Sequence, residues 1–466
     1  MKKALIVITS DIYIRNYLRT EAFSELHRIM DCDYVADSRV KNSNDLEILP
    51  GFRGYFSIPD KARYLHDFHF SLMMWRFRKR SRTFTHRWLR NSGWHAVKRV
   101  GSPWVRVLSF LSWLVGSIRN PHGLRIPLLA NPLTYPLTSA IVRKRLEINS
   151  DIAKYFDLTS YDVCLFPSAA FDAATVDAIR IGKRKSVPTV CLIDNWDNLT
   201  SKTVFWKLPD FLGVWGLQAK EQAMRIHGFK AEQVTLLGTP RFEPYFKYRQ
   251  MHLESHYQFP YILFVGSAMP YDELGALHEL EGLIARDVHQ KDSLKIIYRP
   301  HPWQQKRATN AIFDESEFSR TVLDFQMKKA YEGGVLPEKT DEKFQPSLDY
   351  YPSLLANAEV VVGPLTTMLL EAALSLRPVI GLSYYDGYHA NTSLRYFSHF
   401  EGTEKIPGFN LCESRDALPG LLSDTLSIGQ IDESLSTEAT KYFVFNDSRD
   451  YPQRLANFVS EVSNNP

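Results

Sequence analysis

Residues Val360 to Leu382 decide the predicted fold. Their sequence is Val-Val-Val-Gly-Pro-Leu-Thr-Thr-Met-Leu-Leu-Glu-Ala-Ala-Leu-Ser-Leu-Arg-Pro-Val-Ile-Gly-Leu. The three valines at 360–362 predict a buried parallel strand, because continuous β-branched runs are typical of strands covered on both faces. The Gly-Pro pair at 363–364 is expected to break that strand. Thr366 and Thr367 are suited to capping a following helix. The stretch therefore predicts a strand, a turn and a helix, followed by another strand.

The start of that helix is a candidate anion site. The first N–H groups of a helix lack partners and the helix dipole is positive there, so a negative group is attracted. Glu371 follows Thr367 by about one helical turn, and its carboxylate can accept hydrogen bonds from sugar hydroxyls. An ordinary strand–helix unit with a surface glutamate is the alternative. Gly363, Thr366, Thr367 and Glu371 are therefore candidate donor contacts.

Length and composition set the broad class. A chain of 466 residues is too long for one ordinary core, which favours two large domains. The four cysteines lack the spacing of a metal site, and Cys164 and Cys191 lie in apolar, strand-like runs. We therefore expect buried thiols in a reducing cytoplasm and no metal site.

Residues 61–119 differ in composition from the rest of the chain. Thirteen Lys or Arg face one acid, so this segment carries +12, whereas the whole chain carries +4. Trp and Phe alternate with these charges, as in segments that lie in the headgroup region of an anionic membrane. A basic helical insertion packed on its own domain is the structural alternative. Nucleic-acid binding would use the same ingredients, but no recognised motif supports it, so no nucleic-acid partner is expected.

No membrane-spanning segment or signal peptide is expected. The longest apolar stretch, Trp104 to Ile118, is shorter than the roughly 20 residues that a spanning helix needs. The apolar run near the N-terminus ends at Asp11 after five residues and predicts a first strand. We therefore expect a cytoplasmic protein that is peripheral on the inner face of the cytoplasmic membrane.

Strand-like runs alternate with helical patterns along the chain, which predicts an α/β protein with two Rossmann-like domains. The expected N-terminal domain covers 1–245 with a helical insertion at 61–136, and the expected C-terminal domain covers 261–440. Residues 246–260 are expected as a linker, and 441–466 as a terminal helix that packs back on the first domain. No GxGxxG follows the first strand, so a dinucleotide cofactor is not indicated.

The secondary structure of two shorter segments is also predicted. Residues Ile141 to Phe156 are expected to form one helix. The polar piece from about 308 to 345 is expected to be irregular helix and loop.

A polar cluster, Asp194-Asn-Trp-Asp-Asn-Leu-Thr-Ser-Lys202, follows the strand expected at 189–193. Loops at the carboxyl ends of strands in open sheets hold ligand contacts. Asp194 or Asp197 could act as a general base, whereas Asx turns and a helix cap are the structural alternative. Asp11, behind the first strand, is a further candidate base. Candidate acceptor contacts are Asn195, Trp196, Lys202 and Arg241.

The expected C-terminal domain contains further candidate contacts. Gly266 and Ser267 follow the strand 261–265, where glycine permits close approach of a ligand to the backbone. Arg299 and His301 follow another strand and are held by neighbouring prolines, and a cation with an imidazole suits a diphosphate. A structural ion pair is the alternative for the arginine. Asp386 lies in a polar loop behind a later strand and is a secondary candidate.

Taken together, these segments resemble one superfamily. The second half is similar to the nucleotide-binding domain of GT-B-fold glycosyltransferases, near the bacterial UDP-N-acetylglucosamine 2-epimerases and CDP-glycerol glycerophosphotransferases. The resemblance rests on Arg299-Pro-His-Pro302, on Gly363 to Glu371 followed by Arg377-Pro-Val, and on Val234-Thr-Leu-Leu-Gly-Thr-Pro240. It implies two Rossmann-like domains that face a cleft, a nucleotide-activated sugar as donor substrate, and no required cofactor.

The chain departs from the epimerases at two places. They carry Ser-Gly-Gly where this chain has Leu365-Thr-Thr, and His-x-Glu-Ala-Gly where it has Asp194-Asn-Trp-Asp-Asn. The resemblance therefore favours a glycosyltransferase that moves a sugar to a lipid-linked or surface-polysaccharide acceptor. A CDP-glycerol-type polyol-phosphate transferase and a non-catalytic envelope-polymer or membrane-binding subunit are the alternatives.

Overall fold

The computed structural model forms two compact units. The described residues are 1–40, 44–90, 125–249, 253–269, 271–286, 293–301, 313–332, 347–387, 396–429 and 431–464, with Trp104, Val107, Leu111, Val115 and Met251. The first unit contains the described residues from Met1 to Arg241 and those from Lys441 onward. The second unit contains those from Phe242 to Thr440.

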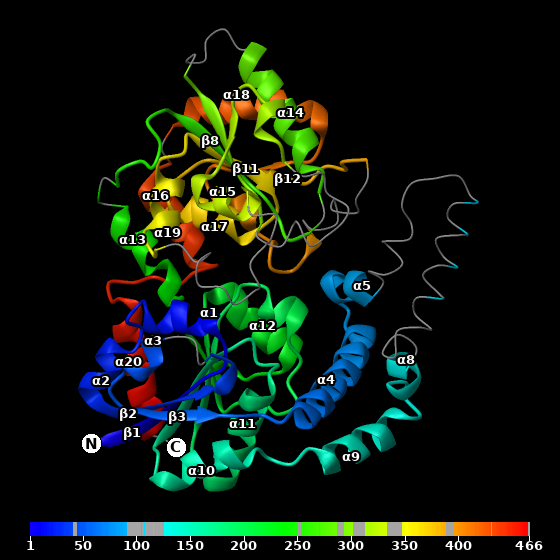
Figure 1. The fold of residues 1–466 in the computed structure, drawn as a ribbon, viewed down its shortest axis with the longest axis vertical. Coiled ribbons are helices and arrows are strands. Elements are labelled where there is room, and N and C mark those ends of the chain that lie inside the picture. Colours follow the sequence, from blue (N-terminus) through cyan, green and yellow to red (C-terminus); the bar gives the residue numbers. More distant parts are fainter. Residues whose placement is uncertain are drawn as a thin grey trace. The chain divides into compact units, whose positions relative to one another are not determined.

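The first unit is built on a parallel sheet of seven strands in the order β3-β2-β1-β4-β5-β6-β7 (Figure 1). Its strands are β1 (Lys2–Ile8), β2 (Met30–Asp37), β3 (Phe52–Phe56), β4 (Val163–Ser168), β5 (Thr189–Ile193), β6 (Phe211–Val214) and β7 (Val234–Leu236). Side chains alternate between the two faces: Ala4 and Ile6 belong to one core cluster, and Leu5 and Val7 to another. Such burial on both faces explains the continuous apolar runs of these strands.

Helices cover both faces of this sheet. The helices of the first unit are α1 (Asp11–Tyr13), α2 (Ser24–Ile29), α3 (Asn44–Glu47), α4 (Asp60–Arg80), α5 (Phe84–Arg90), α8 (Arg125–Leu129), α9 (Tyr135–Arg145), α10 (Ser150–Leu158), α11 (Ala173–Lys185), α12 (Leu217–His227) and α20 (Tyr451–Asn464), with the π-helices η1 (Ile14–Leu18) and η3 (Asn198–Lys202). Of these, α8 and α9 pack against α4. Figure 1 shows α20 beside α2, and Tyr451, Leu455 and Phe458 join the core cluster beneath them. The C-terminal helix therefore completes the first unit.

The second unit has a parallel sheet of six strands in the order β10-β9-β8-β11-β12-β13. Its strands are β8 (Tyr261–Val265), β9 (Lys295–Arg299), β10 (Thr321–Leu323), β11 (Val360–Pro364), β12 (Val379–Leu382) and β13 (Phe409–Cys412). Its helices are α13 (Glu243–Tyr248), α14 (Glu273–Arg286), α15 (Phe325–Glu332), α16 (Tyr350–Ala356), α17 (Thr367–Leu374), α18 (Leu418–Ile428) and α19 (Glu433–Lys441). The stretch 246–260, expected as a linker, begins inside α13.

Three local expectations need correction. Residues 141–156 do not form one helix: α9 ends at Arg145, and Asn149 caps α10 by accepting a hydrogen bond from the Ile152 N–H at 3.0 Å. The Gly-Pro pair at 363–364 does not break β11, because Gly363 pairs with Gly381 and the strand runs to Pro364. Within the stretch expected to be irregular helix and loop, the structure places the helix α15 but also the edge strand β10, which was not expected.

The described part of the basic segment packs on the first unit through α4. Leu72 forms a small core cluster with Ile126 and Ala130, against which Phe68 and Trp75 pack. Part of the aromatic content of this segment is therefore explained by packing. Among the residues that the structure describes, no helix has both the length and the apolar composition needed to cross a membrane.

Candidate functional site

The second sheet has a topological switch point between β8 and β11. From β8 the chain proceeds to β9 and β10 on one side, and from β11 to β12 and β13 on the other. The connections on the two sides diverge from this position, which leaves a crevice outside the carboxyl ends of the two strands. Gly266 and Ser267 follow β8, and Leu365 to Thr367 follow β11. The sequence-predicted donor residues thus gather where open α/β sheets bind ligands.

Two glycines allow the chain to pass closely at this edge. A Cβ atom on Gly363 would lie 2.2 Å from the Val265 carbonyl oxygen. A Cβ atom on Gly266 would lie 2.8 Å from the His301 backbone nitrogen. The Gly266 N–H also donates to the Arg299 carbonyl at 2.8 Å. The ends of β8 and β11, and the turns behind β8 and β9, therefore approach closely, and only glycine fits at both positions.

The helix α17 begins at this edge. Its N-cap is Thr366, as the sequence predicts, but the threonine side chain makes no capping hydrogen bond. Thr366 and Thr367 are both partly exposed. One turn along the helix, Glu371 is only 5% exposed and its Oε2 accepts a hydrogen bond from the Tyr245 hydroxyl at 2.6 Å. Glu371 is thus a positioned, buried carboxylate and not a surface side chain.

Ser267 is held by an internal network. Its N–H donates to Glu273 Oε1 at 2.9 Å, and the Tyr298 hydroxyl donates to Glu273 Oε2 at 2.7 Å. Glu273 and Ser267 are both buried. The Ser267 N–H is therefore already used by a carboxylate of the chain, so its contribution to this edge is to shape the turn.

Arg299 lies in a buried ion pair. The side chain is 3% exposed, its Nη1 bonds to Asp324 Oδ2, and its Nη2 donates to the Tyr351 hydroxyl at 2.6 Å. Burial by itself would lower the pKa of Arg299, but Tyr351 and Asp324 outweigh it and raise that pKa above its usual range. The guanidinium that we expected to face a diphosphate is thus paired inside the unit, as in the structural alternative.

His301 and Asp386 complete the predicted set in this unit. His301 follows β9 and is partly exposed next to Gly266. Asp386 is 5% exposed, accepts the Asp272 N–H at 2.9 Å, and borders a cavity of about 580 Å³ that Glu279 also lines.

In the first unit, Asp194 follows β5 and is almost completely buried. Its Oδ1 accepts the Asn16 amide at 2.9 Å, and its Oδ2 accepts the Asn195 amide at 2.9 Å. Burial raises the pKa of Asp194, opposed by the hydrogen bond from Asn16 and by the charges of Arg241 and Lys202. Asn195 and Lys202 of the predicted polar cluster, together with Arg241 from farther along the chain, are thus brought around one carboxylate.

Asp197 is more accessible. It precedes η3 and forms an ion pair with Lys202 at 2.9 Å, with 27% of the aspartate side chain exposed. The Ser201 hydroxyl donates to its Oδ2 at 3.2 Å. Of the two carboxylates in this loop, Asp197 is therefore the more exposed.

The structure separates Trp196 from the expected acceptor contacts. Its side chain is 5% exposed, its Nε1 donates to Gln218 Oε1 at 2.8 Å, and it packs edge-on against Phe443. Trp196 is a core residue, because its ring faces inward from the loop. Asp11 begins α1 behind β1 and is partly exposed. Since β4 lies between β1 and β5, Asp11, the further candidate base, follows a different strand of this sheet edge from Asp194 and Asp197.

Sequence reasoning missed several partners of these residues. Asn16, Tyr245 and Asp324 each bond a predicted residue from at least 25 positions away in the chain, and Glu273 bonds Ser267 from six positions away. Only Glu273 had a local signal, since it is an acid at the start of a helix that follows a glycine turn.

The two units, each a parallel sheet with flanking helices, define a two-domain α/β chain of the GT-B fold class. Specifically, the chain is similar to the UDP-GlcNAc 2-epimerase from Methanocaldococcus jannaschii, with a TM-score of 0.50 and 11% identity over 98% of this chain and 99% of that one. At this identity the similarity concerns the fold.

Other solved structures match with lower scores. One is S. aureus MnaA with UDP, with a TM-score of 0.47 and 12% identity over 100% of this chain and 97% of that one. Another is Acinetobacter baumannii MurG, with a TM-score of 0.41 and 10% identity over 99% of this chain and 100% of that one. No protein-family model matches the chain, and no curated protein matches its sequence.

Proposed function

We propose that the protein is a glycosyltransferase that takes its sugar from a nucleotide-activated donor. The observation that carries this proposal is the edge of the second sheet at β8 and β11, where Thr366, Thr367 and the start of α17 follow the close approach of strand ends at Gly266 and Gly363. In this proposal the N-terminus of α17 binds the diphosphate, because its N–H groups and dipole favour an anion. Glu371 accepts hydrogen bonds from the ribose hydroxyls.

His301 replaces Arg299 as the proposed side-chain contact to the diphosphate. The imidazole is partly exposed at the same edge, whereas the guanidinium is committed to Asp324. A side chain that donates a hydrogen bond at this position stabilises the negative charge that grows on the leaving diphosphate during transfer. UDP is the first nucleotide to test, since the Methanocaldococcus jannaschii protein of the same fold is named for a UDP-sugar.

We propose that Asp197 is the general base of a single displacement. The acceptor hydroxyl oxygen attacks the anomeric carbon, the bond from that carbon to the diphosphate oxygen breaks, and the hydroxyl proton passes to the carboxylate. Accessibility favours Asp197 over Asp194, whose two oxygens accept amide hydrogen bonds inside the unit. Asp194 then acts as a positioning residue that holds Asn16 and Asn195.

A nucleotide panel tests the donor site. UDP at about 100 times its dissociation constant should stabilise the protein by about 2.7 kcal/mol, which a thermal-shift measurement detects. Glu371→Gln should weaken UDP binding at least tenfold while an exposed control, Glu438→Gln, leaves it unchanged. Stabilisation by CDP but not by UDP would instead favour the alternative function, a CDP-glycerol-type polyol-phosphate transferase. No stabilisation by any nucleotide would refute the proposal.

Asp197→Asn tests the chemistry separately. The variant should bind UDP as the wild type does but lose at least a hundredfold in transfer rate, because general-base catalysis contributes about 10² to 10⁴. The assay follows UDP release from UDP-sugars in the presence of membrane lipid extracts. Wild-type transfer in Asp197→Asn would exclude this base.

We further propose that the acceptor is lipid-linked or a surface polysaccharide and that the protein binds the inner face of the cytoplasmic membrane. Trp104 is 77% exposed, and Val107, Leu111 and Val115 are also exposed. These four positions are three, four and four residues apart, which places their side chains on one face of a helix. An exposed apolar face within a segment of charge +12 suits an anionic bilayer.

Vesicle flotation tests this membrane contact. The protein should float with vesicles that contain phosphatidylserine and should be released by salt. Replacement of Trp104 and Leu111 by Ser should weaken flotation, whereas Leu435→Ser, an exposed leucine of the second unit, should not. Wild-type protein that fails to float would refute the membrane contact and leave the donor site untouched.

A further inference from the structure

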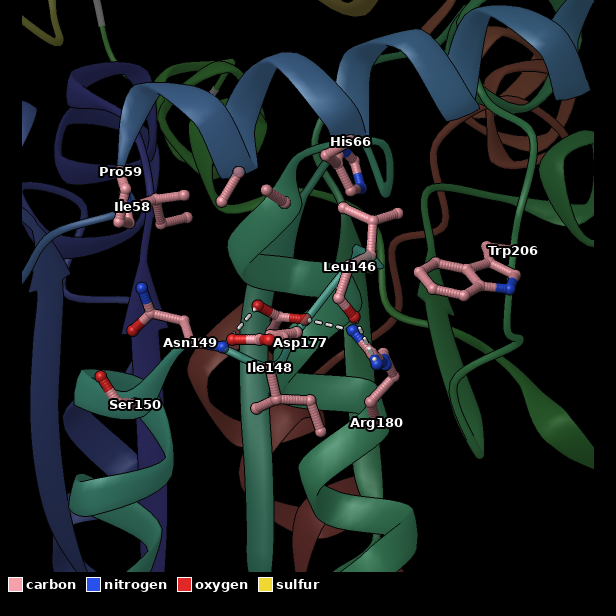
Figure 2. Close-up of a pocket in the computed structure, with 13 residues that line it drawn as sticks. Ile58, Pro59, His66, Leu146, Ile148, Asn149, Ser150, Asp177, Arg180 and Trp206 are labelled. Carbon is pink, nitrogen blue, oxygen red and sulfur yellow. Dashed lines mark hydrogen bonds and ion pairs between the residues drawn. The ribbon is translucent and has the colours of Figure 1, made fainter. Parts of the chain in front are cut away.

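The first unit contains a cavity that no candidate donor or acceptor residue lines. Its volume is about 210 Å³, and its lining residues come from α4, the start of α10, α11, the segments that precede α4 and α10, and Trp206. Figure 2 shows residues of these helices around one space, with His66 on α4 and the Asp177–Arg180 pair on α11. A cavity of about 150 Å³ accommodates a benzene-sized ring, so this one suits a single six-membered ring with substituents.

One wall carries an ordered polar pair. Asp177 is 8% exposed and accepts the Asn149 N–H at 3.0 Å and Arg180 Nη1 at 3.0 Å. Arg180 Nη2 donates to the Leu146 carbonyl at 2.9 Å, which fixes the guanidinium. Neighbouring acceptor and donor groups are thus held rigidly at the cavity, an arrangement that matches two adjacent hydroxyl groups.

The opposite side carries an unsatisfied histidine. His66 is 5% exposed, and its buried Nδ1 makes no hydrogen bond in the described part of the chain. The Asp67 carboxylate lies 3.7 Å from this nitrogen, beyond hydrogen-bond distance, and its side chain is mostly exposed. Since a buried polar atom without a partner costs about 1–3 kcal/mol, this nitrogen favours a ligand that supplies one.

The remaining walls are largely apolar and include one aromatic ring. Ile58, Pro59, Ala62 and Ile148 line the cavity together with Trp206. Arg180 lies 5.0 Å from the centre of the Trp206 ring, which helps to fix the indole. Apolar walls with a few fixed polar groups are the usual composition of a small-ligand site.

We propose that this cavity binds one neutral pyranose ring of a glycan. A pyranose presents apolar C–H faces to the aliphatic and indole walls, and its edge presents vicinal hydroxyls to Asp177, Arg180 and His66. An anionic ligand does not fit, because Arg180 is already paired with Asp177 and a second acidic residue, Glu147, also lines the cavity. This site contains only first-unit residues and does not depend on the proposed nucleotide chemistry.

Saturation-transfer NMR with methyl glycosides of glucose, galactose and N-acetylglucosamine tests the proposal on the full chain. At least one glycoside should bind with a dissociation constant of about 10 mM or less, and saturating UDP should not displace it. Ala62→Leu should fill the cavity from α4 and abolish the signal. Lys61→Leu, at an exposed position on the same helix, should preserve it.

His66→Phe provides a second variant, since it removes the nitrogen and retains a ring. It should weaken glycoside binding at least tenfold, while circular dichroism and UDP binding by the second unit report that the chain is folded. Absence of binding by all three glycosides, or equal binding in wild type, Ala62→Leu and His66→Phe, would overturn the proposal. Glycoside binding without UDP binding would refute the donor site alone.

Discussion

Arg299→Met tests whether the arginine of the Arg-Pro-His-Pro motif serves the fold or the ligand. The substitution leaves Asp324, which is 0% exposed, without its cationic partner. Breaking a buried ion pair from one side costs about 3–5 kcal/mol, because the remaining charge stays desolvated. Tyr257 and Tyr350 still donate hydroxyl hydrogen bonds to Asp324, so we expect the lower end, about 3 kcal/mol.

A double variant and a surface control sharpen this test. Arg299→Met with Asp324→Leu removes both charges and should recover most of the lost stability, since apolar replacements of a buried pair are often neutral. Arg415→Met breaks the ion pair with Glu279, in which the arginine side chain is 52% exposed. This control should cost less than about 1 kcal/mol.

The assay is urea unfolding at neutral pH followed by circular dichroism, with UDP affinity measured for each folded variant. If Arg299 serves the fold, the double variant binds UDP within about threefold of the wild type. A single variant within about 1 kcal/mol of the wild type would refute the buried-pair energetics. A double variant that is stable but binds UDP tenfold more weakly would show that Arg299 contributes to the donor site.

Two further perturbations test other parts of the structure. Burial lowers the pKa of His86 and of His227 from 6.5 to about 4, so between these pH values only the unfolded state binds each proton. The free energy of unfolding should therefore fall by about 1.4 kcal/mol per pH unit for each histidine as the pH decreases from 6.5 toward 4. In urea-unfolding experiments, His86→Gln should reduce this dependence of stability on pH. A stability that does not change with pH would contradict the prediction. Gly363→Ala should cost about 2 kcal/mol or more, because its Cβ would collide with the Val265 carbonyl oxygen. The helical control Gly420→Ala, with no atom within 4 Å of the added Cβ, should be neutral or stabilising by up to about 1 kcal/mol, and equal thermal midpoints for the two variants would contradict the close strand approach.

The order of strands and helices is largely predictable from local sequence. Val360 to Val362 form a buried strand and the next helix begins directly after Thr366, because apolar runs and helix-start residues act over a few neighbouring positions. The same reasoning misplaced the end of β11. Gly363 continues the strand because it pairs with Gly381, and that pairing lies outside any local window.

The C-terminal helix is likewise predicted from local sequence but placed by tertiary contacts. A terminal helix is predicted within 441–466, and α20 forms there from Tyr451 to Asn464. Its place in the core beneath α2 depends on contacts with residues more than 400 positions earlier in the chain. Local patterning specifies which face is apolar, whereas topology decides what covers it.

By itself, the sequence determined two series of parallel strands and the polar turns at their carboxyl ends. Only the tertiary structure decided the states of the side chains in those turns: Arg299 is paired with Asp324, Trp196 is buried against Gln218, and Glu371 is bonded to Tyr245. The physical reason is that burial and ionic or hydrogen-bond partners come from distant parts of the chain. A residue type at a strand end therefore predicts its chemistry, but its neighbours in space decide whether that chemistry is free to act.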